Sequence, residues 1–166
     1  RIVFINQFGW SRDRCGNRMP ATMEFADLRR GADVEFGQSI YEPFGIAQLE
    51  PLSSGALCAV STACGCLGFV RDAGGTESPN IVIADYLQLP DWAMPNQFPY
   101  VFDIGRAQRD AVEASVANGV AQQLIYRLPR SSELATRLLE GGTELSQKMS
   151  WEVVARDYLL PAMERL

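Results

Sequence analysis

The chain has 166 residues, of which 47% are hydrophobic and 21% charged, and this composition is ordinary for a folded protein. Its length suits one globular domain with a sizeable core. The formal charge of −5 argues against a nucleic-acid or acidic-membrane partner, because no excess of positive charge would attract phosphates at long range.

The composition also restricts the chemistry and the compartment. The sequence contains no histidine, which removes Ser-His-Asp and Cys-His mechanisms and His-ligated metals. The segment "CGC" at 64–66 lacks the Cys-x-x-Cys spacing of zinc ribbons, so we expect no metal site. Cys58 lies in an apolar run, which favours a small buried hydrophobe. Reduced thiols and a cytoplasmic location follow as expectations.

Four short runs rich in apolar and β-branched residues predict strands, at about residues 1–5, 33–37, 57–61 and 81–85. Helical stretches separate or follow these runs, and this alternation predicts right-handed βαβ units in a doubly wound parallel sheet of the α/β class. The first run begins at once, without an initiator methionine, so we expect a piece of a longer protein. No signal peptide or apolar stretch long enough to span a bilayer is visible.

The segment "SIYEPFGIAQLEPLSSG" at 39–55 follows the second predicted strand. Pro43 suits the first position of a helix, which predicts an α-helix that begins at residues 43–46. The amides of Phe44, Gly45 and Ile46 would then be unpaired donors at the carboxyl end of a parallel strand, where doubly wound sheets bind phosphates.

The two glutamates of this segment fit around such an anion cradle. Glu42 would lie at its mouth, and Glu50 would lie about 80° further around an ideal helix. A carboxylate at Glu50 could accept hydrogen bonds from vicinal hydroxyls, as acidic residues do with ribose. Pro51 would bend the helix near residue 47. Two glutamates at this spacing also arise by chance, so the spacing alone leaves both interpretations open.

The remaining segments predict two loops and three helices. Residues 6–22 and 85–102 are predicted loops, the latter with three prolines and five aromatic residues. Asp103 would cap a helix that reaches about Tyr126. Ser131 would cap the next, which Gly141-Gly142 would end. Ser150 would cap the last helix. One face of this helix would carry an apolar stripe that belongs either to the core or to a seam with another domain: Trp151, Val154, Ala155, Tyr158, Leu159 and Ala162.

The segment "DVEFGQSIYEPFGIAQLEPLSSGALCAVS" resembles the donor-binding segment of retaining nucleotide-sugar glycosyltransferases with the GT-B fold, which has two Rossmann-like domains. "MSWEVVARDYLLPAMERL" is similar to their closing helix. "EPFGIAQ" looks like the glycogen and starch synthase version, with Gln48 at its glutamine, whereas Glu50 looks like the broader group.

The resemblance implies a role for individual residues. Glu42 would contact the donor sugar near the reacting carbon as the catalytic residue, and Glu50 would hold the ribose hydroxyls. The amides of Phe44, Gly45 and Ile46 would hold the sugar or diphosphate. Gly65, in "TACGCLG", would match a glycine-rich turn in which Cys64 replaces a usual glycine.

The resemblance also implies the reaction and the partners. The chain would be the C-terminal donor-binding half of an enzyme that transfers a hexose, with retention, from ADP- or UDP-glucose to a glycan. The N-terminal acceptor domain would be absent, and the leaving phosphate would make a histidine, a metal or another cofactor unnecessary. A non-catalytic nucleotide- or glycan-binding module is the main rival. A dinucleotide oxidoreductase is disfavoured, because no G-x-G-x-x-G follows a predicted strand.

Overall fold

The structure is a computed structural model that describes residues 11–16, 19–37, 42–87 and 104–165, without the side chains of Arg12 and Cys15. The chain divides into two compact units, residues 1–32 and residues 33–166. The predicted strand at 1–5 and most of the predicted loop at 85–102 lie outside the described residues.

The described residues of the first unit form two short helices, α1 (Arg12–Cys15) and α2 (Phe25–Arg30). The predicted loop at 6–22 therefore includes one helical turn. Helix α2 follows Glu24, whose backbone N–H donates to the Asp27 carboxylate at 2.8 Å. This bond satisfies one of the amides that a helix start leaves without a helical partner.

The second unit is built on a three-stranded parallel sheet with the order β1-β2-β3. Its strands are β1 (Val34–Gly37), β2 (Leu57–Ser61) and β3 (Ile81–Ala84). The three predicted strands that fall on described residues, and their parallel pairing, are confirmed. All residues of β2 are buried, as expected for a strand between two neighbours with both sheet faces covered.

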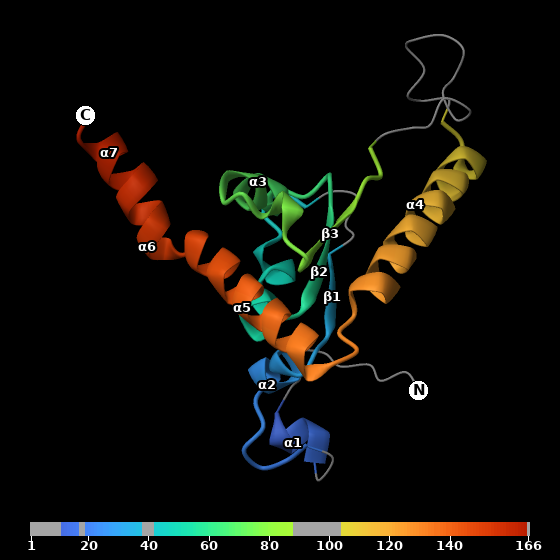
Figure 1. The fold of residues 1–166 in the computed structure, drawn as a ribbon, viewed down its shortest axis with the longest axis horizontal. Coiled ribbons are helices and arrows are strands. Elements are labelled where there is room, and N and C mark those ends of the chain that lie inside the picture. Colours follow the sequence, from blue (N-terminus) through green and yellow to red (C-terminus); the bar gives the residue numbers. More distant parts are fainter. Residues whose placement is uncertain (1–10, 17–18, 38–41, 88–103, 166) are drawn as a thin grey trace. The chain divides into compact units, whose positions relative to one another are not determined.

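Helices cover both faces of this sheet, as Figure 1 shows. One face packs against α3 (Cys66–Asp72), and the other packs against α4 (Arg106–Arg127). Helix α5 (Ser132–Lys148) contributes to both cores, with Leu145 on the α3 side and Leu138 on the α4 side. The molecule is thus an α/β protein, with apolar residues buried above and below a short parallel sheet.

Short 3-10 helices connect the strands: η3 (Ile46–Gln48), η4 (Glu50–Ser54) and η5 (Gly75–Glu77). The fully buried Asn80, just before β3, donates from its amide nitrogen to the carbonyls of Ala56, at 3.1 Å, and Leu138, at 3.0 Å. These bonds tie the start of β2 to α5, and they satisfy a polar group that would be costly to bury alone.

Two predicted helix boundaries are corrected. Helix α4 is capped at Gly105 instead of Asp103, which lies outside the described residues. Helix α5 begins after its predicted cap, since the Ser131 hydroxyl accepts from the Leu134 amide at 3.3 Å. It does not end at Gly141-Gly142, however, but continues to Lys148. A β-carbon at Gly142 would lie 2.2 Å from the Leu52 carbonyl oxygen, so this glycine permits close packing of α5 on η4.

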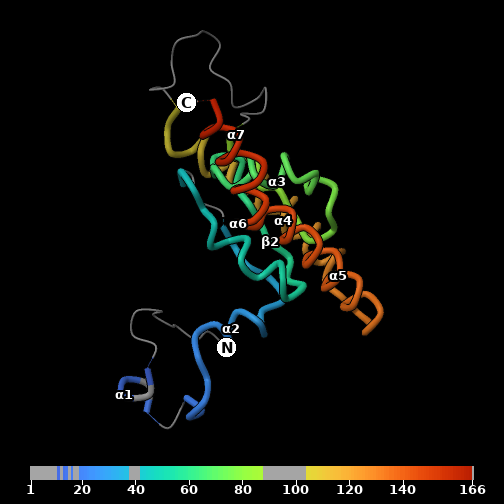
Figure 2. Tube along the Cα trace, turned by 90° about the vertical axis from the view of Figure 1, so that its left-hand side faces the viewer, coloured from blue at the N-terminus to red at the C-terminus, as the bar shows by residue number. Residues whose placement is uncertain are grey.

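The C-terminal stretch forms α6 (Trp151–Val154), the π-helical turn η8 (Ala155–Leu159) and α7 (Leu160–Met163). Figure 2 follows this path from α5 to the end of α7. Ser150 is the predicted cap, since its hydroxyl accepts from the Val153 amide at 3.5 Å. None of the described residues 151–165 is buried, so the interpretation of the apolar stripe as core is wrong, and Trp151 is 79% exposed. No described helix is long and apolar enough to cross a membrane.

The role of Gly142 can be tested by substitution. Gly142→Ala should lower the free energy of unfolding by about 1–3 kcal/mol, because the new methyl group meets a backbone carbonyl that cannot move without shifting η4. Gly119→Ala is the matched control, since a β-carbon there meets nothing within 4 Å and alanine should stabilise helix α4 by about 0.5–1 kcal/mol. Urea denaturation of both variants measures the difference. Equal effects would contradict the close packing.

Candidate functional site

The loop after β1 differs from its prediction. Pro43 lies in a bend, and the first helical residue is Ile46, so the predicted α-helix from Pro43 is wrong. Gly45 adopts a left-handed conformation with φ of 61° directly before η3. The helical path is then interrupted at Leu49, between η3 and η4, near the bend that Pro51 predicts.

The carboxylate of Glu42 explains why the loop turns back on itself. Its Oε1 accepts hydrogen bonds from the Phe44 amide at 3.3 Å and from the Gly45 amide at 3.2 Å. Amides that were predicted to be open donors for a ligand thus bind an anionic side chain of the same loop. The loop does bind a carboxylate oxygen, as a cradle for anions would, but in this structure Glu42 itself supplies that oxygen.

This loop lies against the turn that follows β2. Glu42 and Cys64 form an isolated parallel bridge, and the Gly65 amide donates to the Glu42 carbonyl at 2.9 Å. A β-carbon at Gly65 would lie 1.9 Å from the Pro43 carbonyl oxygen, so no side chain fits there. Four predicted site residues, Glu42, Phe44, Gly45 and Gly65, are therefore neighbours beyond the carboxyl ends of β1 and β2.

The amide of Gly65 is consequently engaged within the protein. Its bond to the Glu42 carbonyl leaves it as a structural link between two loops, and no contact to a donor is needed to explain a glycine at this position. Sequence reasoning had no means to identify this link, because residues 42 and 65 are distant in the chain.

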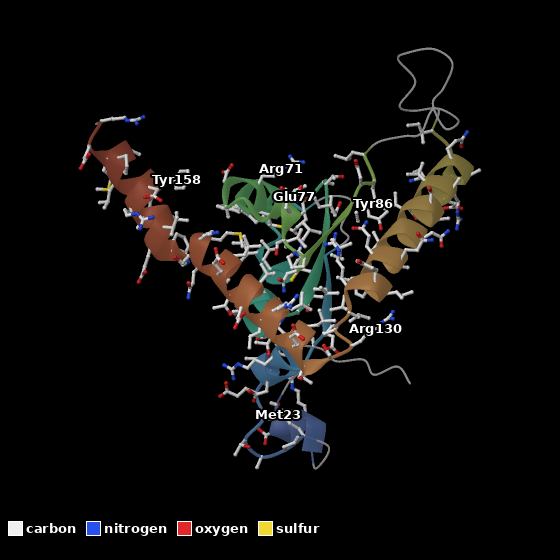
Figure 3. All side chains as sticks on the ribbon, viewed as in Figure 1. Met23, Arg71, Glu77, Tyr86, Arg130 and Tyr158 are labelled. Atoms are coloured by element: carbon white, nitrogen blue, oxygen red, sulfur yellow. The ribbon has the colours of Figure 1, made fainter. Side chains whose placement is uncertain are left out.

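A polar pair that the resemblance did not include lies at the ends of β2 and β3. The Thr62 hydroxyl donates to the Asp85 carboxylate at 2.9 Å, and the Leu87 amide donates to the same oxygen at 3.1 Å. Asp85 thus caps the backbone turn that follows β3. Tyr86, labelled in Figure 3, packs against the α4 side of the core, and burial, followed by the nearby Glu113, raises the pKa of its hydroxyl.

Beneath the Glu42 loop lies a buried group of sulfur and amide atoms. The Gln48 Nε2 donates to the Cys64 Sγ at 3.3 Å, and the Cys64 and Cys66 sulfurs lie 3.0 Å apart. Burial, and then the hydrogen bond with Cys64, raises the pKa of the Cys66 thiol, so it is neutral at physiological pH. Cys58 is fully buried, as predicted. Among the described residues, no group of three or more acidic or cysteine side chains could hold a metal ion.

Gly37 and Gly45 make room for this group. A β-carbon on Gly37 would lie 1.6 Å from the Gln48 Cγ, and one on Gly45 would lie 2.1 Å from the Cys64 Sγ. Gln48 was expected only as a feature of the family that the segment resembles. The sequence contains no signal that this polar side chain, between Ala47 and Leu49, is buried.

Glu50 is separate from this loop contact and lines a surface groove of about 290 Å³. Ile46 also lines the groove, as do aromatic and apolar residues from α3, from the position after α5 and from α6: Cys66, Phe69, Met149, Trp151 and Val154. Glu42 is not part of its lining. The predicted site residues thus fall into a loop group around Glu42 and a groove group around Glu50, and Ile46 lies between the two in the chain.

The packing of Gly45 yields a prediction with a matched control. Gly74→Ala introduces a side chain at a left-handed φ of 70° with nothing within 4 Å, and should cost about 1–2 kcal/mol of stability. Gly45→Ala has the same backbone strain and adds the contact with Cys64, so it should cost a further 1–3 kcal/mol, roughly. Chemical denaturation of both variants gives the difference. A Gly45→Ala cost no larger than that of Gly74→Ala would show that the loop is not packed as described.

Comparison with known proteins adds no relative to these observations. The chain matches no family model, no curated protein and no solved structure. Two features therefore bear on function: the loop group around Glu42, at the carboxyl ends of β1 and β2, and the groove group around Glu50, beside α6.

Proposed function

We propose that this chain is the nucleotide-sugar-binding half of a retaining glycosyltransferase with a Rossmann-like, doubly wound GT-B domain. The donor would be ADP- or UDP-glucose or a similar compound, and the acceptor would be a glycan. One observation carries the proposal. The Glu42 loop and the turn at 62–66 meet beyond the carboxyl ends of β1 and β2, where parallel α/β sheets bind their ligands.

The chemistry of the Glu42 loop suits a donor phosphate or sugar. Two backbone amides converge on one anionic oxygen, which is the arrangement that binds phosphate or hydroxyl oxygens in loops of this kind. A donor oxygen would replace the Glu42 oxygen on the Phe44 and Gly45 amides. The released carboxylate would then face the sugar and stabilise positive charge that develops at the reacting carbon.

The groove beside Glu50 suits the nucleoside. Glu50 is exposed at the first residue of η4, at the edge of a groove whose other walls are largely apolar. A base and ribose would place apolar surface in the groove and offer vicinal hydroxyls to the carboxylate, in the way acidic residues bind ribose in dinucleotide folds. The leaving phosphate would assist removal of the acceptor proton, so the proposal requires no histidine and no metal.

The proposal includes a partner domain and a compartment. An N-terminal Rossmann-like domain of the parent protein would bring the acceptor, and the exposed apolar residues Trp151, Tyr158 and Leu159 would contribute to the seam with it. Reduced thiols at Cys58, Cys64 and Cys66 agree with a cytoplasmic location. No nucleic acid or membrane is part of the proposal.

A second function has one observation in its favour. Because the Glu42 carboxylate already occupies the loop amides, a module that binds nucleotides or glycans through the groove alone, without turnover, would leave Glu42 in its present position. This alternative differs from the first in its dependence on Glu42, which substitution can measure.

Thermal stabilisation by nucleotide diphosphates and their sugars tests the proposed ligand, because a ligand that binds only the native state raises the melting temperature. Glu50→Ala should weaken nucleotide binding by roughly 10- to 150-fold through loss of charge-assisted hydrogen bonds to ribose. Glu140→Ala, which removes an exposed carboxylate from α5, should leave the affinity unchanged. Equal affinities for the Glu50→Ala and Glu140→Ala proteins would contradict the ribose contact.

Turnover by the parent protein separates the two functions. Glu42→Gln retains an oxygen that can accept from the loop amides but lacks the charge that stabilises the transition state, so it should lower turnover by about 10²–10³-fold with little change in donor affinity. Parallel kinetics and binding measurements give both constants. If Glu42→Gln leaves the parent's turnover intact, the catalytic assignment is wrong.

The 166-residue chain by itself should not sustain glucosyl transfer, because the resemblance covers only the donor-binding half and the acceptor would be held by another domain. An assay with ADP-glucose and UDP-glucose and an oligosaccharide acceptor checks this expectation. Sustained formation of a longer oligosaccharide by the isolated chain would overturn it.

A further inference from the structure

Cys64 and Cys66 form a contact that the proposed function does not use. Their sulfurs lie 3.0 Å apart and share a hydrogen bond, whereas a disulfide needs about 2.05 Å, so a shift of roughly 1 Å would join them. Residues two apart lie within about 7 Å of each other even in extended chain, which is inside the span of a disulfide. Only Gly65, which has no side chain, separates the two cysteines.

We propose that Cys64 and Cys66 form a redox-active dithiol, which low-molecular-weight disulfides such as glutathione disulfide oxidise reversibly to a disulfide. The proposal is independent of the nucleotide-sugar assignment, because it requires only the two thiols and the loops around them.

The reaction proceeds by two exchanges. The Cys64 thiolate attacks one sulfur of glutathione disulfide, so a Cys64–glutathione bond forms and one glutathione leaves as a thiolate that takes up a proton. The Cys66 sulfur, after losing its proton, attacks the Cys64 sulfur and releases the second glutathione. Two protein thiols lose two electrons and two protons in total, and one glutathione disulfide becomes two glutathione thiols.

Cys64 is the first thiol to react because it lies directly under an exposed loop. It is 4% exposed, whereas Cys66 is fully buried. The loop above it carries the exposed side chains of Phe44 and Ile46 and contains only a short 3-10 helix, so it can open locally at low cost. The fully buried Cys58 belongs to β2, the central strand, and should stay unreactive in the native state.

Oxidation would also change the loop that carries Glu42. The Cys64 thiol donates a weak hydrogen bond to the Phe44 carbonyl, with a distance of 3.8 Å, and the Cys64 sulfur accepts a hydrogen bond from the Gln48 side chain. A disulfide has no hydrogen to donate, so the bond to Phe44 is lost, and the inward movement of Cys64 lengthens its contact with Gln48. The loop at 42–48 should therefore be less firmly held in the oxidised protein.

Redox titration of the purified chain tests the proposal. The protein is equilibrated at graded ratios of glutathione to glutathione disulfide, quenched with acid, denatured, alkylated and analysed by fragmentation mass spectrometry. We expect the segment with Cys64 and Cys66 to lose the mass of two hydrogens and to escape alkylation at oxidising ratios, while Cys58 is alkylated throughout. Dithiothreitol should reverse the change. Alkylation of Cys58, Cys64 and Cys66 at every ratio, or a disulfide that includes Cys58, would overturn the proposal.

Variants and amide exchange separate the steps. Cys66→Ser should trap glutathione on Cys64, whereas Cys58→Ser should still form the disulfide; the wild-type titration stands by itself if either variant does not fold. Hydrogen exchange over residues 42–48 should become several-fold faster on oxidation, with β2 unchanged. Disulfide formation without faster exchange in this loop would show that the coupling to the Glu42 loop is wrong.

Discussion

The candidate site depends on the contact between the loop at 42–45 and the turn at 62–66, and that contact depends on two missing β-carbons. Gly65 lets the Pro43 carbonyl approach the turn, and Gly45 lets its own loop close over the Cys64 sulfur. With any side chain at either position the loop would have to move outward. The orientation of Glu42 and the burial of Gln48 are both consequences of this approach.

This contact connects the two residue groups described above. On the inner side it covers the buried side chains of Gln48, Cys64 and Cys66, and on the outer side it leaves Glu42 and the exposed ring of Phe44 at the surface. Cys66 also lines the groove beside Glu50. The sulfur pair thus contacts the loop group through Cys64 and the groove group through Cys66.

Periodicity and composition were sufficient to predict the three strands that the structure describes, because a parallel strand buried on both faces has a continuous apolar sequence such as "LCAVS" in β2. Caps at Ser131 and Ser150 were also readable, since each bond closes within three residues. The Glu42 loop was misread because a proline after a strand suits a bend as well as a helix start. The hydrogen bonds that favour the bend are accepted by the side chain of Glu42, and a pattern of residue types does not reveal them. Gly142 was misread as a stop because its reason lies in η4, which is distant in sequence.

The π-helical turn η8 has a consequence for the C-terminal stretch as a whole. A π-turn contains one residue more than an α-helical turn, and one residue corresponds to about 100° of rotation around the axis. The turn precedes Pro161, whose ring would clash with the carbonyl four residues earlier in a regular α-helix. In evolutionary terms, η8 has the form of a one-residue insertion in a regular helix. Deletion of that residue would rotate α7 by about 100° around the helix axis, so that different side chains of α7 would lie on the same face.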